Sequence, residues 1–255
     1  MDIFADREWT DWLPTYAWAI EHREGVIVVD TGQSTHLLEQ ARRSLHPYIR
    51  WQARFQIEPE QELGPQLKAL GIGPRDVRQV MLTHLHIDHD AGLRHFPHSK
   101  ICIAAGEIAK ARGVMGTLRG YLPQRWPDWF SPSPLVLDDG PHGPFRASKR
   151  LTRDGDVVAV ATPGHTADHI SVIVDDGDVA FFLAGDTSYD EALMLAGKVD
   201  GVSASAAASG ATLGAIRDFA RQRPTVYLPT HDPMSGGRFA RRQIVPLFGQ
   251  AGKPG

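Results

Sequence analysis

Four short apolar runs of this chain each end on side chains that bind metal ions. The first run, Val77 to Leu82, leads directly into Thr83-His84-Leu85-His86-Ile87-Asp88-His89, which places three imidazoles and a carboxylate within six positions. The other three runs lead in the same way into His165, Asp186 and His231. Strands of one sheet deliver their terminal loops to a common edge, so residues far apart in sequence can meet there. The chain is therefore expected to form strand-rich layers with a metal site along one edge.

Strands and helices are predicted to alternate around these runs. Val26 to Val29 is a continuous β-branched run that predicts a buried strand, and Glu58 to Leu70 predicts a helix with Pro59 in its first turn. The turn pairs Asp154-Gly155 and Asp176-Gly177 predict antiparallel strands in the second half. Further helices are expected over Glu107 to Arg112 and Ser203 to Arg221. This order favours an α/β layer architecture, and we expect one domain over residues 1–255.

A segment rich in proline, glycine and aromatic residues interrupts this patterning from Gly113 to Gly143. Long irregular stretches inside compact domains are usually lids, binding loops or disordered, and so many aromatics argue against disorder. Two interpretations remain: a loop that covers a substrate, or a loop that packs on the core.

Composition excludes several classes of partner. A formal net charge of -3 gives no electrostatic basis for binding nucleic acid or an anionic membrane. No run approaches the roughly 20 apolar residues that span a bilayer, and the first residues lack the apolar core of a signal peptide. We therefore expect a cytoplasmic protein. The single cysteine, Cys102, is expected in a buried strand without chemistry.

The spacing of the first motif allows two metal pockets to share one loop. His84 and His86 face the same side of an extended backbone, whereas Asp88 and His89 can turn toward a neighbouring point. Imidazole nitrogens and carboxylate oxygens suit Zn, Fe, Mn or Co, and one cysteine cannot form a thiolate-rich zinc cage. The identity of the metal stays open.

The run His84-Leu85-His86-Ile87-Asp88-His89 resembles the H-x-H-x-D-H motif of the metallo-β-lactamase superfamily. The resemblance extends from Val26 through Thr162-Pro163-Gly164-His165 to His231. It implies an αβ/βα sandwich of two packed mixed β-sheets flanked by helices. It also implies two divalent metal ions, with zinc preferred and Fe, Mn or Co as alternatives. The implied order is His84, His86 and His165 on one ion, Asp88, His89 and His231 on the other, and Asp186 as the bridge.

Differences within the superfamily narrow the implied activity. True β-lactamases usually carry Cys or Ser at the position of Asp186, so this Asp argues against antibiotic hydrolysis as the main activity. Diiron oxygen reductases typically carry Glu at the position of His86, so this His disfavours a redox activity. Gly185-Asp186-Thr187-Ser188-Tyr189 is similar to the N-acyl homoserine lactonases, in which a tyrosine at this spacing hydrogen-bonds the lactone carbonyl. Ala196-Gly197 resembles the small-residue segment beside the lactone in those enzymes. The resemblance thus implies a quorum-quenching lactonase whose partner is a small-molecule ester, with Tyr189 and Gly197 at the substrate.

The acyl-chain pocket is the part of the resemblance that does not carry over. In the lactonases a longer amino terminus helps to line this pocket, so the aromatic stretch from Tyr121 to Phe130 is a candidate substitute wall. Its predicted substrate-binding residues are Trp126, Trp129 and Phe130.

The implied mechanism needs no covalent intermediate. A hydroxide bridging the two ions would attack the ester carbonyl, because a bound cation lowers the pKa of water from about 15.7 to near 7. Tyr189 and one metal ion would stabilise the oxyanion, and Asp88 would receive a proton and then pass it to the leaving alkoxide. Asp30 and His169 are predicted to orient ligands.

Two other activities stay open. A thioesterase of the glyoxalase II type shares all seven ligands and usually carries a basic carboxy-terminal clamp, for which Arg238, Arg241 and Arg242 are candidates. Another promiscuous metal-dependent esterase belongs to the same class. A non-hydrolytic diiron redox or sensor protein belongs to a different class. The sequence specifies neither the acyl-chain preference nor the oligomeric state, so a homodimer also stays open.

Overall fold

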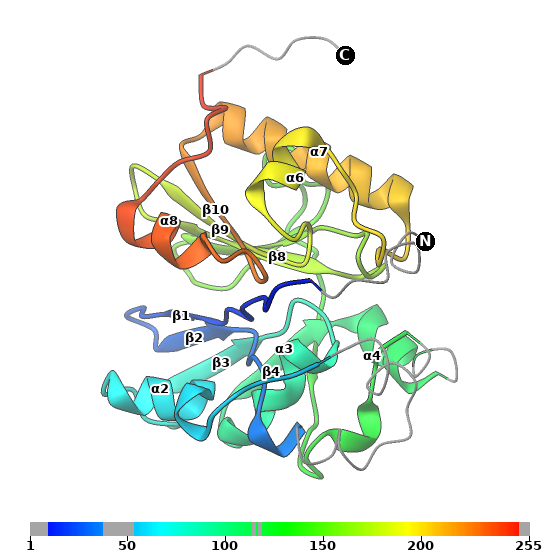
Figure 1. Cartoon of the computed structure of the whole chain (residues 1–255). Helices are drawn as coiled ribbons and strands as arrows, with labels where there is room; N and C mark the ends of the chain where they lie inside the picture. Colours follow the sequence, from blue (N-terminus) through cyan, green and yellow to red (C-terminus); the bar gives the residue numbers. More distant parts are fainter. Residues whose placement is uncertain (1–9, 38–53, 114–115, 117–118, 250–255) are drawn as a thin grey trace. The chain divides into compact units, whose positions relative to one another are not determined.

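A computed structural model of the chain describes residues 10–37, 54–113, 116 and 119–249 (Figure 1). The chain divides into two compact units: an amino-terminal unit, Ala17–Leu135, and a carboxy-terminal unit, Val136–Gly255 together with Met1–Tyr16. Each unit contains a five-stranded mixed sheet with flanking helices, which confirms the predicted fold class. The prediction that 1–255 forms one domain is not tested and stays a prediction. No helix within the described ranges has the length and apolar character needed to cross a membrane.

The sheet of the amino-terminal unit has the strand order β1-β2-β3-β4-β5. Its first pair is antiparallel and the other three pairs are parallel. The β-branched run of β2 is fully buried, as continuous apolar strands of parallel sheets are. The strands are β1 Trp18–Ile20, β2 Val26–Val29, β3 Val77–Met81, β4 Lys100–Ala104 and β5 Ser133–Leu135.

Helices of the same unit cover this sheet through one apolar core. Leu67, Leu93 and Ala111 contribute to that core from three different helices, together with strand residues such as Val80. The helices are η3 Pro59–Gln61, α2 Leu63–Ala69, α3 Ile87–Asp90, η4 Ala91–His95, α4 Ala105–Arg112 and η5 Pro123–Arg125. Cys102 is buried in β4, as predicted.

The helix predicted over Glu58 to Leu70 is divided into two at Glu62. The backbone of Glu62 is extended, with φ -65° and ψ 147°. Its buried carboxylate accepts hydrogen bonds from Thr35 and Arg94 and lies 2.6 Å from Nε2 of His95. These tertiary contacts outweigh the helical preference of the segment.

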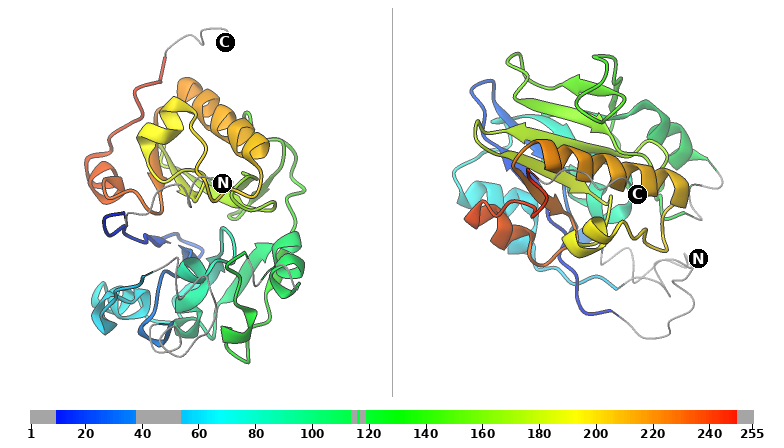
Figure 2. Two further views of the ribbon diagram at one scale, coloured as in Figure 1. Left: turned by 45° about the vertical axis from the view of Figure 1, so that its right-hand side comes forward. Right: turned by 90° about the horizontal axis from the view of Figure 1, so that it is seen from above.

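The sheet of the carboxy-terminal unit has the strand order β10-β9-β8-β7-β6. Only the β9–β10 pair is parallel. The long helix α7, Ala206–Gln222, begins at the N-cap Ser205 and lies over this sheet with α6, Glu191–Ala196 (Figure 2). The remaining elements are β6 Ser148–Arg150, β7 Val157–Ala161, β8 Ile170–Asp175, β9 Ala180–Gly185, β10 Thr225–Pro229 and α8 Ser235–Arg241.

The segment 113–143 is less irregular than predicted. It contains η5 and the short strand β5, which pairs with β4. The boundary between the two units follows Leu135, within this segment. Residues 114–115 and 117–118 lie outside the described part of the chain.

Candidate metal centre

In the amino-terminal unit, Asp30 supports the loop that carries the first motif. Asp30 follows β2 with a positive φ of 60°, a conformation that Asp tolerates better than most residues. Its buried carboxylate accepts a 2.8 Å hydrogen bond from the amide of Thr83 and a 2.9 Å bond from the Thr83 hydroxyl. The same carboxylate lies 2.9 Å from Nδ1 of His89. One side chain thus fixes both ends of the motif.

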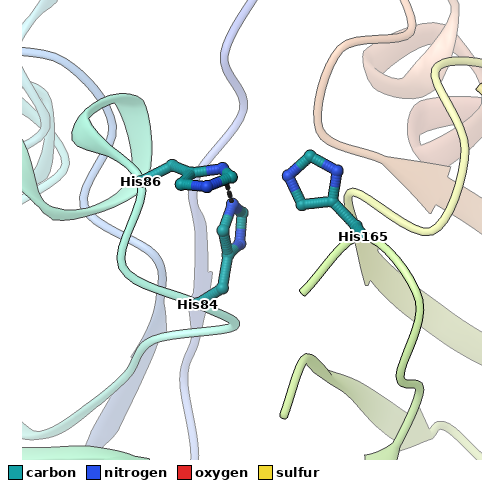
Figure 3. A group of neighbouring side chains, drawn as sticks. All are labelled: His84, His86 and His165. Atoms are coloured by element: carbon teal, nitrogen blue, oxygen red, sulfur yellow. Dashed lines mark hydrogen bonds between the residues drawn. The ribbon is translucent and has the colours of Figure 1, made fainter. Parts of the chain in front are cut away.

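The imidazoles of the motif lie against one another. Nε2 of His84 is 3.0 Å from Nδ1 of His86, and this contact is drawn in Figure 3. The ring of His84 also lies 4.1 Å from that of His89, measured between centroids. His84 and His89 are completely buried. Several buried imidazole nitrogens at such distances suit a shared cation, because neutral imidazole is a common ligand of divalent metal ions.

The short helix α3 places Asp88, the remaining predicted ligand of the motif. His86 is the N-cap of this helix, so Asp88 and His89 stand in its first turn. Nε2 of His89 is 3.8 Å from Oδ2 of Asp88. The four predicted ligands of the amino-terminal unit are therefore brought together in one short segment, a loop and the first turn of α3.

In the carboxy-terminal unit, Asp186 connects two predicted histidine ligands. Its Oδ2 atom is 3.4 Å from Nε2 of His165 and 3.3 Å from Nε2 of His231. His165 follows β7, Asp186 follows β9 directly, and His231 follows β10. This unit also brings its predicted ligands together, here from three strand ends.

Hydrogen-bond partners define the tautomers of two predicted ligands, His89 and His231. A carboxylate or carbonyl oxygen accepts hydrogen bonds, so an imidazole nitrogen that faces it carries the proton. Nδ1 of His89 faces Asp30, and Nδ1 of His231 lies 2.9 Å from the carbonyl oxygen of Pro14. In the neutral form both rings therefore keep the lone pair on Nε2. Proteins commonly orient metal-binding histidines in this way, and the donor set fits divalent metal ions.

His169 and Gly164 support the carboxy-terminal ligands through the backbone. The amide of Asp186 donates a 3.1 Å hydrogen bond to Nε2 of His169, whose Nδ1 lies 2.9 Å from the Thr162 hydroxyl. A Cβ atom on Gly164, which has φ 152°, would come within 2.3 Å of Oγ of Ser209 at the start of α7. Gly164 thus allows the loop that precedes His165 to approach this helix.

The predicted substrate residues of this unit lie in different surroundings. Tyr189 is half-buried, and its ring centroid is 5.5 Å from that of His231. Gly197 ends α6 in the left-handed conformation, and a Cβ atom there would come within 2.6 Å of Arg217. The structure thus accounts for Gly197 by helix capping, and its predicted contact with substrate stays a prediction.

A cavity of about 360 Å³ lies within the amino-terminal unit, beside α3. Ile87, Leu122 and Trp126 contribute apolar surface to its wall. Trp126 donates a 2.6 Å hydrogen bond to Asp90, which also lines the cavity. Burial raises the pKa of Asp90 to about 7, against the lowering effect of this hydrogen bond.

The other two predicted wall residues do not line this cavity. Phe130 packs in the core, with its ring centroid 4.8 Å from that of Trp126, and Trp129 is 39% exposed. Of the three aromatic residues, the structure places only Trp126 at the described cavity.

Sequence reasoning missed a buried ion pair directly after His231. Asp232 and Arg238 are both buried, and the guanidinium of Arg238 donates a hydrogen bond to the carboxylate of Asp232. Arg238 was a candidate for a basic substrate clamp, and its burial against Asp232 contradicts that role. Arg242 pairs with Asp176, with 2.6 Å between Nη1 and Oδ2. Asp232 and Arg238 are six residues apart in the sequence, and this spacing alone does not predict a contact. They meet because the chain turns after Asp232 and enters α8, which carries Arg238.

Comparison with known proteins gives one family and several relatives. A family model described as the Metallo-beta-lactamase superfamily matches residues 10–231. A probable metallo-hydrolase of Mycobacterium tuberculosis is 33% identical over 178 residues, which are 67% of this chain and 55% of that protein. The chain thus spans little more than half the length of this relative.

Lactone hydrolases are similar over more of their length. The N-acyl homoserine lactonase AttM of Rhizobium radiobacter is 23% identical over 241 residues, which cover 90% of this chain and 86% of the lactonase. A solved N-acyl homoserine lactone hydrolase, with N-hexanoyl-L-homoserine bound at its catalytic metal center, has a TM-score of 0.73 and 19% identity. The alignment covers 92% of this chain and 86% of that chain, and at this identity it establishes a similarity of fold.

Proposed function

Since the chain belongs to the metallo-beta-lactamase superfamily, we propose that it is a metal-dependent hydrolase that opens lactone esters, with N-acyl homoserine lactones as substrates. The position of Tyr189 is the observation that carries this proposal. Its ring lies beside His231, three residues beyond Asp186. The similarity to a lactonase over most of both chains supports the same substrate class.

The metal-binding part of the proposal uses all seven predicted ligands. His84, His86 and His165 would hold one divalent ion, and Asp88, His89 and His231 would hold the second. Asp186 would bridge them, which agrees with an Oδ2 atom within 3.4 Å of both His165 and His231. Zinc is the proposed metal, with Fe, Mn and Co as alternatives. Bound divalent ions would supply an acidic water and polarise the ester carbonyl.

Tyr189 and Asp88 have separate roles in the proposed reaction. The phenol of Tyr189 would donate a hydrogen bond to the carbonyl oxygen as negative charge develops there. Asp88 is partly exposed at the first turn of α3, so its carboxylate is accessible to a small molecule. It would receive the proton released by the attacking water and deliver it to the leaving alkoxide.

The cavity beside α3 supports a site for the apolar part of the substrate. Ile87 and Asp90 are three residues apart and therefore share one face of α3, which the cavity follows. Trp126 closes it with an aromatic surface whose orientation is set by the bond to Asp90. Apolar burial of an acyl chain contributes roughly 0.8 kcal/mol per methylene group, so such a cavity can select chain length.

The decisive variant is Tyr189→Phe, which removes the donor and keeps the aromatic ring. Turnover of acyl homoserine lactones should fall about 10- to 1,000-fold, nearer the lower end because a metal ion would stabilise the same oxygen. The metal content should not change. A lactone panel and a thioester panel, measured on the same preparations, separate lactonase from thioesterase activity.

A matched control is Tyr16→Phe, which removes the phenol of another half-buried tyrosine in the carboxy-terminal unit. This variant should turn over lactones at the rate of the unmodified protein. If Tyr189→Phe keeps its metal and also keeps the full rate on lactones, the proposed lactone substrate is wrong.

A further inference from the structure

Asp232 is a buried carboxylate that joins the two loops of the carboxy-terminal unit which carry His231 and Tyr189. Asp232 follows His231 directly and is only 3% exposed. One oxygen accepts a 2.8 Å hydrogen bond from the amide of Met234, in its own loop. The other oxygen accepts a 3.1 Å bond from the amide of Glu191, two residues beyond Tyr189. The loop after β9 is thus attached to the loop after β10.

Arg238 holds this carboxylate in place. The guanidinium, in a residue 5% exposed, donates to Asp232 through Nη2 and to the carbonyl oxygen of Tyr227 through Nε, at 3.1 Å. Its Nε is also 3.6 Å from Oε2 of Glu191. A buried ion pair adds little net stability, but the loss of one partner leaves the other charge uncompensated. The arrangement is therefore better suited to fixing geometry than to stabilising the fold.

A second attachment lies on the other side of Tyr189. The buried hydroxyl of Tyr227, in β10, is 2.8 Å from Oγ of Ser188 and 2.7 Å from Oγ1 of Thr187. Tyr189 therefore lies between two attachments to β10 and its following loop, one at Ser188 and one at Glu191. A short segment held at both ends has few backbone conformations, so the Cα–Cβ bond of Tyr189 keeps nearly one direction.

We propose that Asp232, held by Arg238, is a positioning residue that sets the placement of the Tyr189 phenol beside His231. The inference rests on the proposed role of Tyr189 as a donor to the ester carbonyl. It assigns to Asp232 no contact with substrate. Loss of the carboxylate should loosen the Glu191 end of the segment and misplace the phenol.

A double-mutant cycle tests whether Asp232 acts through Tyr189. If Tyr189→Phe lowers kcat about tenfold and Asp232→Asn lowers it by a similar factor, the double variant should fall no further than the larger single effect. The KM should change little, because an oxyanion donor acts in the transition state. Effects that multiply in the double variant would overturn the proposal.

Glu62→Gln is the matched control. Glu62 lies in the amino-terminal unit and, like Asp232, is a buried carboxylate paired with an arginine of its own unit, Arg94. Glu62→Gln should change kcat little. In the double variant with Tyr189→Phe, the fold-change in kcat should equal the product of the two single fold-changes. Arg238→Lys is a milder variant if Asp232→Asn does not fold. It keeps the charge but loses the planar fork, and the same lack of additivity with Tyr189→Phe is expected.

A measurement without substrate separates this proposal from the proposed function. The chain has five tyrosines, so isotope-labelled tyrosine rings give few NMR signals, and Tyr189→Phe identifies the one from Tyr189. Asp232→Asn should shift or broaden that signal, whereas Glu62→Gln should leave it in place. An unchanged Tyr189 signal in Asp232→Asn would overturn the positioning role. Absence of lactone hydrolysis with a shifted signal would reject the proposed function and leave the positioning role supported.

Discussion

In the amino-terminal unit the predicted ligands share one short loop, whereas in the carboxy-terminal unit they come from the ends of three separate strands. The segment from His84 to His89 is supported by two adjacent residues: the carboxylate of Asp30 accepts from Thr83 and faces His89, and Thr31 donates to the carbonyl oxygen of His89. The carboxy-terminal ligands have separate supports: His169 binds the backbone of Asp186, and the carbonyl oxygen of Pro14 faces His231. The compact motif thus depends on one neighbouring segment, Asp30-Thr31, whereas the dispersed ligands depend on several separate segments.

This difference predicts which replacements are most damaging. One carboxylate oxygen of Asp186 lies within 3.5 Å of two other predicted ligands of its unit, His165 and His231. In the proposed centre a change at Asp186 would therefore affect both ions, whereas a change at a supporting residue would affect one ligand.

The largest effect is expected from Asp186→Asn. An amide keeps the size of the side chain but removes the negative charge that would balance two cations, so metal content and turnover should fall together. Turnover should fall by about 1,000-fold or more, since the dinuclear chemistry is lost. Elemental analysis and lactone turnover on the same sample provide the measurement. Full metal content with normal turnover would show that Asp186 is not the bridge.

The second effect compares the two kinds of support. Asp30→Asn should lower metal affinity about 10- to 100-fold, as is typical when the partner of a metal-binding histidine is changed. Asn also tolerates the positive φ of this position, so the backbone should be preserved. Chelator competition measures the affinity.

His169→Gln is the corresponding variant in the carboxy-terminal unit. Glutamine can accept from the Asp186 amide and donate to Thr162, so metal affinity should change less than about threefold. If His169→Gln weakens metal binding more than Asp30→Asn does, the contrast between ligands supported by one segment and ligands supported by several is wrong.

The sequence predicted those parts of the fold that depend on local pattern. β2 was predicted to the residue, because a β-branched run bounded by a polar turn defines a buried strand. β1 was missed because three residues, Trp18–Ile20, carry too little periodicity. The split at Glu62 and the Asp232–Arg238 pair depend on tertiary contacts, which composition and spacing do not reveal.

The same distinction applies to the candidate centre. His84 to His89 form a recognisable motif by themselves, whereas His165, Asp186 and His231 were found only because each follows a predicted strand. The aromatic wall was predicted from composition alone, and composition could not tell that Phe130 packs in the core and Trp129 faces solvent.

A smaller effect is expected at the cavity of the amino-terminal unit. Trp126→Ala should reduce the preference for long over short acyl chains by about 3- to 10-fold, because it removes apolar surface from the wall. Trp129→Ala, an exposed tryptophan in the same segment, serves as the control and should leave the preference unchanged. If the two variants have equal effects on substrates of all chain lengths, the segment 113–143 has a structural role and does not select the substrate.

A last effect, on stability rather than on activity, concerns the amino-terminal unit at acid pH. Burial acts to raise the pKa of Glu62, but hydrogen bonds from Thr35, His95 and Arg94 lower it to about 2 from the model-compound value of 4.5. A carboxyl with a depressed pKa contributes stability above the unfolded value, and this contribution is lost as the pH falls through the folded value.

Glu62→Gln should therefore destabilise the metal-free protein by about 1–3 kcal/mol at pH 7 and by less near pH 3. Urea unfolding of both proteins at several pH values measures the difference. A destabilisation that stays constant between pH 7 and pH 3 would show that the charge of Glu62 contributes nothing.

Metal content tests the central claim most directly, because the proposed centre requires both ligand groups at once. Seven ligands exceed what one tetrahedral ion can use, so protein expressed with excess metal and freed of loosely bound ions should contain about two ions per chain. Replacement of His89 in one unit, or of His231 in the other, should each lower this content. One ion or fewer per chain in the unmodified protein, after metal-replete expression, would contradict the dinuclear account.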